Sequence, residues 1–383
     1  MCAVPQPEQF LLGPFTVPRI WTGLWQLSSN AWGSVPAVKI RQEMARYTAS
    51  GYTAFDMVGL FRISDLTRIS PTGATWVLLR VRVLASNPIR DICRQRNTAD
   101  HYGSSELLFG QFLQSLPSAQ RVLGATKWCV FGTIDPSRAV VEAAVHERMA
   151  RMQIDHIDLL QFHWQNYQDK GYLTALRILQ ALCDEGKILA LGLCNFDAVR
   201  TDEICTELGP RSIVSNQVQF SLIDNRPLHG MNHVCEKHNL KLLAYGTLCG
   251  GFLADRWLNQ PEPEFYSGQL NPSQRKYLDM IVKAWGDWAL FQSLLVVLRS
   301  IADQYDGVSI ANVATRWVLQ HPFVGAVIIG SARLGITDHT EENSVVFGFT
   351  LSENDLAAIE AVLRSSNSSR MISTIGDCGA EYR

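Results

Sequence analysis

Apolar and polar positions follow two alternating periods along this chain. Short runs rich in branched and aromatic residues are typical of buried strands, and between them apolar residues recur every three or four positions, as in helices that face a core. We expect strands at 19–25, 53–57, 121–129, 158–164, 190–196, 214–222, 241–248 and 326–331, and helices at 38–50, 104–116, 137–152, 173–185, 200–208, 228–238 and 310–320. Strands that alternate with helices pair in parallel, and eight such units predict a closed (β/α)8 TIM barrel.

Two segments are longer than a barrel connection requires. Residues 250–306 follow the seventh strand and include a helical pattern at 273–288. Residues 58–98 follow the second strand and hold seven Arg, no Lys, two Asp and no Glu, a net charge of 7 − 2 = +5. This insertion is interpreted as a surface segment without function, an Arg patch for a phosphorylated partner, or a translated intron or gene-model error. We expect one barrel domain over residues 1–364, followed by a loose tail at 365–383.

The amino-acid composition indicates which kinds of molecule this protein binds. The 383 residues are 47% hydrophobic and 18% charged, as in a globular protein, and the net charge of −2 offers no broad positive field for nucleic acid or an anionic membrane. Apolar runs are too short to span a bilayer, and the start lacks a secretion signal. We therefore expect a cytoplasmic protein, a monomer or weak homo-oligomer, that acts on a small molecule. Nine scattered cysteines predict neither a metal site nor disulfides.

Polar residues stand where three successive strands end. Asp56 closes the second strand, Lys127 the third and His163 the fourth, and strand alternation lets all three face the barrel mouth, where the active sites of such barrels lie. Tyr102 follows across the insertion. Taken singly, each has an ordinary interpretation as an ion pair, a core histidine or a surface tyrosine, but their joint occurrence favours a site.

These residues stand in segments that resemble the aldo-keto reductase family. With 58–98 removed, Phe55-Asp56-Met57 continues into Ala99-Asp100-His101-Tyr102-Gly103, which is similar to the family's Asp-x-Ala-x-x-Tyr-Gly pattern. The resemblance covers residues 15–57 and 99–364, and its further segments are Ala125-Thr126-Lys127, Asp158 to Trp164, Gly192 to Phe196, Asn216 to Gln219 and Leu243 to Tyr245. It implies NAD(P)H-dependent reduction of aldehydes or ketones to alcohols.

The resemblance also implies roles for the four residues. A phenol of pKa about 10 holds its proton too tightly to give it up easily, and a nearby cation favours its release. Tyr102 is thus expected to be the general acid and Lys127 its cationic neighbour. Asp56 would hold the ammonium, and His163 would donate a hydrogen bond to the substrate oxygen.

The expected cofactor is NADP, with NAD as the alternative, and no Gly-rich phosphate loop is present. By motif correspondence, Asn195 and Gln217 hold the nicotinamide carboxamide and Tyr245 stacks on its ring. Ser331 and Arg333 are candidates for the adenosine phosphate, and Asn343 for the adenine. The chain departs from the family where Gly330 replaces a common Lys, His339 a common Arg and Cys194 a common Ser.

Two other functions remain open at this level. One is a regulatory barrel that binds the cofactor and a partner protein with little turnover. The other is an inactive barrel in which the extra 41 residues between Asp56 and Tyr102 displace the tyrosine from the site.

Overall fold

The computed structural model describes residues 7–28, 35–57, 104–117, 120–266, 268–330 and 339–383. Eight parallel strands close into a barrel in the order β10-β3-β4-β5-β6-β7-β8-β9. These strands are β3 (Ile20–Gly23), β4 (Ala54–Asp56), β5 (Leu123–Val130), β6 (Ile157–Trp164), β7 (Ile188–Cys194), β8 (Ser215–Gln219), β9 (Lys241–Tyr245) and β10 (Val324–Gly330). Each overlaps one of the eight expected strands, so the predicted TIM barrel is confirmed. The insertion at 58–98 lies outside the described residues.

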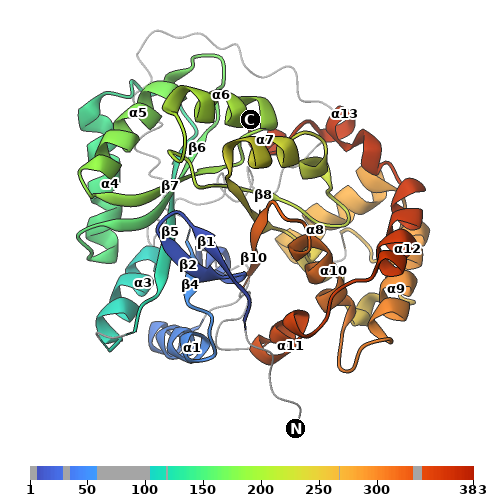
Figure 1. Ribbon diagram of the computed structural model, residues 1–383. Coiled ribbons are helices and arrows are strands. Elements are labelled where there is room, and N and C mark those ends of the chain that lie inside the picture. The colour runs from blue at the N-terminus through green and yellow to red at the C-terminus, as the bar shows by residue number, and fades with distance from the viewer. Residues whose placement is uncertain (1–6, 29–34, 58–103, 118–119, 267, 331–338) are drawn as a thin grey trace.

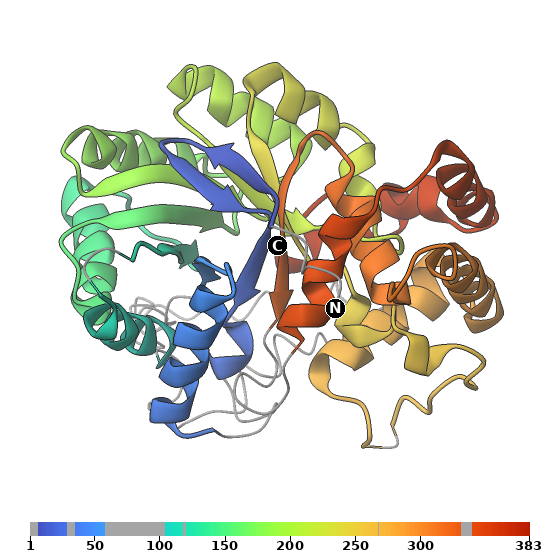
Figure 2. The same cartoon turned by 60° about the horizontal axis from the view of Figure 1, so that its bottom comes forward.

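Helices surround the barrel (Figure 1). They are α1 (Ala37–Ala49), α3 (Ser104–Ser115), α4 (Arg138–Met152), α5 (Gly171–Asp184), α6 (Ala198–Leu208), α7 (Met231–His238), α8 (Pro272–Asp279), α9 (Trp288–Ala302), α10 (Ile310–Leu319), α11 (Thr340–Ser344), α12 (Glu353–Arg364) and α13 (Met371–Ile375). In Figure 2 as in Figure 1, the green helices α4 and α5 lie on one side of the barrel, and the orange to red helices α9 and α12 lie on the other.

A hairpin that the sequence pattern did not predict closes the amino-terminal end of the barrel. Its strands β1 (Gln9–Leu12) and β2 (Phe15–Pro18) pair antiparallel. Leu12 and Val17 join the cluster of apolar residues inside the barrel. The Phe10 ring lies against Gly325 at the start of β10, so closely that a β-carbon there would lie 2.3 Å from the ring. The hairpin thus leaves only the opposite end of the barrel, where the strands end, open to a ligand.

Apolar residues fill the barrel interior and give way to polar ones toward the carboxyl ends of the strands. Side chains of a strand alternate between its two faces. On β5, Leu123 and Ala125 belong to the interior cluster, and the next residue on that face is Lys127. Leu159 of β6 is likewise followed on its face by Gln161 and His163. The same alternation that builds the core therefore presents these polar groups at the mouth.

The excursion after β9 is helical but bent. Its first part is α8 followed by a π-helical turn, η7 (Met280–Trp285), and the chain turns at Gly286 before α9 begins. The expected single helix at 273–288 is thus interrupted, and α9 was not expected. The two helical parts meet at 103°, and no single helix of the described chain is long and apolar enough to cross a membrane.

The residues after α12 are folded, which corrects the expectation of a loose tail at 365–383. Two short 3-10 turns, η9 (Ser368–Arg370) and η10 (Ala380–Tyr382), flank α13. Met371 and Cys378 are buried. The Ser-rich composition suggested disorder, but a few buried side chains and a network of polar contacts fix this segment to the barrel mouth.

Candidate active site

A buried ion pair forms where β4 and β5 end. Lys127 Nζ donates to both carboxylate oxygens of Asp56 at 2.7 Å and to the Met57 carbonyl at 2.9 Å. Both side chains are 6% exposed. Three acceptors satisfy the three protons of the ammonium, as a buried charge requires. This pairing places two of the four expected catalytic residues in contact.

Two glutamines complete the shell around Asp56. Nε2 of Gln161 on β6 and Nε2 of Gln217 on β8 each donate to Asp56 Oδ1 at 2.8 Å. Gln217 also donates to Gln161 Oε1 at 2.9 Å. Gln161 orients the carboxylate from β6, beside β5, and Gln217 orients it from β8 across the barrel, so four strands hold the ion pair.

His163 lies at the same mouth in a neutral form. Its Nδ1 is 2.9 Å from the Cys194 carbonyl, which can only accept, so the proton is assigned to Nδ1. Burial lowers the pKa of His163 to about 4, although the hydrogen bond to Cys194 raises it. Nε2 is buried and has no partner among the described residues. The ring thus offers an acceptor at Nε2, which differs from the expected donor to substrate.

The residue after β7 turns the chain so that its amide faces β9. Asn195 has a φ of +60°, in the left-handed region that asparagine tolerates better than most residues. Its Oδ1 accepts from the Tyr245 hydroxyl at 3.0 Å. Burial, and next the neighbouring Tyr382, raise the pKa of Tyr245 well above its usual value. The phenol therefore stays protonated and donates.

The other expected site residues lie away from this cluster or outside the description. Tyr102, Ser331 and Arg333 fall outside the described residues. Asn343 is half-buried on the short helix α11. That helix lies near α1, since Arg46 of α1 donates to the Thr340 hydroxyl at 3.4 Å, and the Tyr52 hydroxyl just after α1 donates to the Thr340 carbonyl at 2.7 Å.

Comparison with known proteins places the chain in a family. The model of the Aldo/keto reductase family matches residues 89–364, which include six of the eight barrel strands. The chain belongs to this family. Aldo-keto reductase YhdN of Bacillus subtilis is 26% identical over 272 residues, which cover 69% of this chain and 77% of the relative. Protein tas of Escherichia coli is 27% identical over 290 residues, which cover 68% and 80%.

Solved structures share the architecture of this aldo/keto reductase. A glycerol dehydrogenase of Gluconobacter oxydans superimposes with a TM-score of 0.67 at 21% identity, over 95% of this chain and 96% of that one. An aldo-keto reductase of Bacillus halodurans gives 0.62 at 20% identity, over 93% and 96%. At these identities the likeness establishes the barrel alone.

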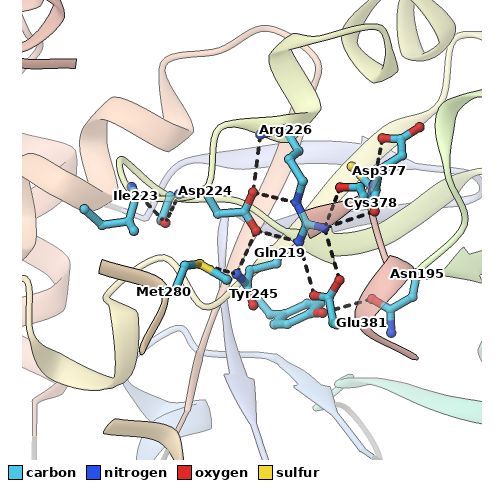
Figure 3. Close-up of polar contacts among 12 residues, drawn as sticks. Asn195, Gln219, Ile223, Asp224, Arg226, Tyr245, Met280, Asp377, Cys378 and Glu381 are labelled. Carbon is cyan, nitrogen blue, oxygen red and sulfur yellow. Dashed lines mark hydrogen bonds and ion pairs between the residues drawn. The ribbon is translucent and has the colours of Figure 1, made fainter. Parts of the chain in front are cut away.

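A second polar cluster in this aldo/keto reductase joins the C-terminal segment to the mouth. Arg226, which is 1% exposed, donates from Nε and one terminal nitrogen to the two oxygens of Asp224 at 2.8 and 2.7 Å. On its other side it contacts both oxygens of Glu381 at 3.1 and 3.2 Å and the carbonyls of Gly376 and Asp377. Figure 3 shows Arg226 between Asp224 and the C-terminal residues. We call this set the Arg226 cluster.

The cluster continues to Tyr245 through Lys276 of α8. Gln219 donates to Asp224 Oδ2 at 2.7 Å and accepts from Lys276 Nζ at 2.8 Å. Lys276 Nζ is 3.3 Å from the Tyr382 hydroxyl, which in turn is 3.2 Å from the Tyr245 hydroxyl. Burial opposes the charge of Lys276, but Tyr382 and Glu381 outweigh it and raise its pKa. The ammonium is therefore retained beside three tyrosine rings.

The donor set at this mouth fits a nicotinamide carboxamide. Both protons of the Gln217 amide are used by Asp56 and Gln161, which leaves Oε1 to accept from a ligand. Asn195 uses Oδ1 toward Tyr245, which leaves Nδ2 to donate. One acceptor and one donor are the complement of a carboxamide. The Tyr245 hydroxyl, however, already contacts the Tyr382 hydroxyl at 3.2 Å.

Several of these residues were not found from the sequence. Gln161 carried a usable signal, because it precedes His163 by two positions and so shares its inward face. Arg226, Lys276, Glu381 and Tyr382 carried none, because their contacts join segments up to 155 positions apart. In the described part of the chain, no three or more His, Cys, Asp or Glu side chains gather as metal ligands would.

Proposed function

We propose that this protein reduces aldehyde or ketone carbonyls to alcohols with NADPH. The observation that carries the proposal is the buried Lys127–Asp56 pair at the mouth of a barrel of the aldo/keto reductase family, with His163 at the same mouth. The cofactor, when bound, supplies the hydride. The protein must supply a proton and hold the substrate oxygen.

Tyr102 is the proposed proton donor, as the sequence motif implies. Lys127 cannot itself serve easily, because Asp56 and Met57 occupy all three of its protons. Its proposed role is electrostatic: a positive charge beside a phenol favours proton release. Asp56, held by Gln161 and Gln217, keeps that ammonium in position.

His163 is proposed to accept a hydrogen bond from the oxygen of the substrate after that oxygen has gained a proton, because a lone pair at Nε2 cannot bind a carbonyl oxygen. With its proton on Nδ1 and a pKa of about 4, the ring is neutral at pH 7 and its Nε2 carries a lone pair. This atom can accept from the hydroxyl of the product alcohol or of the proton donor. The role stabilises the oxygen once it bears a proton, and it replaces the donor role expected from the motif.

Asn195, Gln217 and Tyr245 are proposed to hold the nicotinamide, with Ser331, Arg333 and Asn343 proposed for the adenosine end. NADP is favoured over NAD because Arg333 supplies a guanidinium suited to a phosphate. The departures at Gly330 and His339 make NAD the alternative.

The test is binding followed by turnover. Quenching of protein fluorescence by NADPH and by NADH measures the two Kd values, and loss of NADPH absorbance with a panel of aldehydes measures turnover. Tyr102→Phe is expected to keep NADPH binding and to lose turnover. Binding without turnover by the unaltered chain would contradict the proposal.

A weakly active, cofactor-binding regulatory barrel is the second candidate. The contact of Tyr382 with the Tyr245 hydroxyl favours it, because a segment bound to the residue proposed to stack on the nicotinamide would lower turnover. In that case NADPH binds, and no aldehyde in the panel is consumed.

A further inference from the structure

The C-terminal segment, residues 376–383, lies on the residues proposed to hold the nicotinamide. The Tyr382 hydroxyl is 3.2 Å from that of Tyr245, and the Tyr382 ring meets the His163 ring edge to face with centroids 6.1 Å apart. Gly379 approaches the Asn195 backbone so closely that a β-carbon would lie 2.0 Å from the Asn195 carbonyl oxygen. One segment thus contacts three groups that converge on the mouth.

Contacts from several barrel loops hold this segment down. Arg226 binds Glu381 and two carbonyls of the segment from the loop after β8. Asp377 accepts from the Ala198 amide at the start of α6 at 3.2 Å. Arg383 donates to the Tyr167 hydroxyl at 2.9 Å and lies over that ring. These anchors follow β6, β7 and β8, three neighbouring strands, so they hold the segment along one side of the mouth.

The attachment is polar and confined, which makes it separable from the barrel core. Only Cys378 within the segment belongs to the buried apolar set. The segment contains two glycines with positive φ, Gly376 at +83° and Gly379 at +75°, where backbone direction changes at low steric cost. Releasing it would expose little apolar surface, so its binding depends mainly on charge pairs.

We propose that residues 376–383 form an autoinhibitory plug that must leave the mouth before the nicotinamide can contact Tyr245. The inference rests on the proposed function, which assigns the nicotinamide to Asn195, Gln217 and Tyr245. A ligand that binds only the open form has its apparent Kd raised by the inverse of the open fraction. Weakening the plug should therefore tighten NADPH binding, the reverse of the usual effect of damage at a binding site.

Glu381→Gln tests this in the full-length chain. It keeps the shape of the side chain while removing the charge that pairs with Arg226, and we expect NADPH to bind about tenfold more tightly as the open fraction rises. Glu360→Gln is the matched control: it removes the same charge from an exposed position on α12 and should leave the Kd unchanged.

Amide hydrogen exchange of the unaltered protein provides a readout that needs no variant to fold. The 376–383 peptide should exchange slowly alone and faster with saturating NADPH. NADPH binding with unchanged or slower exchange there, or an equal Kd in Glu381→Gln, would overturn the plug and leave the proposed function standing. Failure of every variant to bind NADPH or NADH would overturn both.

Discussion

The barrel mouth contains two buried ion pairs of similar chemistry but different construction. Asp56 and Lys127 come from neighbouring strands whose register is fixed, with Asp56 paired to Ala125 two positions before Lys127. Arg226 pairs with Asp224 beside it in the same loop, yet its second carboxylate, Glu381, is 155 positions away on a short turn. A charge pair built on strands is rigid, whereas one that depends on a distant turn can be opened.

The difference arises from what surrounds each pair. Four strands hold Asp56 and its partners, and separating them would break barrel hydrogen bonds. Glu381 is 23% exposed on its side chain and is attached to a segment that can leave without disturbing a strand. The two pairs should therefore respond differently to the same kind of substitution.

Lys127→Met should have the largest effect. We expect turnover to fall about a thousandfold while NADPH still binds, and stability to fall by about 3–5 kcal/mol because the Asp56 charge is left buried and unpaired. Steady-state kinetics and urea unfolding measure the two losses. The double variant Lys127→Met/Asp56→Asn should regain stability, because no buried charge is left unpaired, but it should not regain turnover.

The control for that substitution is Lys237→Met, which removes an exposed ion pair with Asp202 on α6. An exposed pair contributes about 0–1 kcal/mol, so stability should change little. Full turnover in Lys127→Met would refute the role given to the strand pair.

Arg226→Met should come next, with a stability loss of about 3 kcal/mol, since Asp224 is fully buried. Chemical denaturation measures it. Because the Arg226 cluster holds the plug, the variant should also bind NADPH more tightly, opposite to what a damaged cofactor site would do. Adding Asp224→Asn to Arg226→Met should restore part of the lost stability. If it does not, the unpaired Asp224 carboxylate is not the cause of the loss.

Acidification should weaken the protein through histidines buried as neutral rings. Burial lowers the pKa of His163 and of His321 to about 4 from 6.5. Their stabilising contribution is therefore complete above pH 6.5 and is lost as pH falls toward 4. At pH 5, which is about 1.5 units below the pKa of an unfolded histidine, each of the two rings lowers the free energy of unfolding by about 2 kcal/mol, at 1.36 kcal/mol per pH unit.

Thermal and urea unfolding between pH 7.5 and 5 measure this loss. His321→Phe, in an aromatic cluster with Phe220 and Trp317, should flatten the pH dependence. His146→Phe, at an exposed position on α4, should not. An unchanged slope in His321→Phe would mean that this ring is charged in the folded protein.

Gly379→Ala should have the smallest effect on global stability, about 1 kcal/mol or less, because only the plug is strained. The methyl would collide with the Asn195 carbonyl and lift the turn, so exchange of the 376–383 amides should rise. Gly132→Ala is the control, since a β-carbon there meets nothing within 4 Å. Equal exchange in both variants would mean that the close approach does not hold the turn.

The sequence predicted the parts of this molecule that depend on short-range patterns. Alternation along single strands was enough to find all eight barrel strands and to place Asp56, Lys127 and His163 at their ends. It did not predict the proton position on His163, because that depends on the Cys194 carbonyl from another strand. Nor did it predict the folded C-terminal segment, whose order comes from contacts with Arg226 and Tyr167 and not from its own composition.

The place of Arg383 has a practical consequence for handling the protein. Its guanidinium lies over the Tyr167 ring, 4.6 Å from the centroid, so any peptide fused behind it would emerge from the reactive end of the barrel. An affinity tag there would pull on the same turn that touches Tyr245. Gln9, where β1 begins, belongs instead to the hairpin that closes the opposite end.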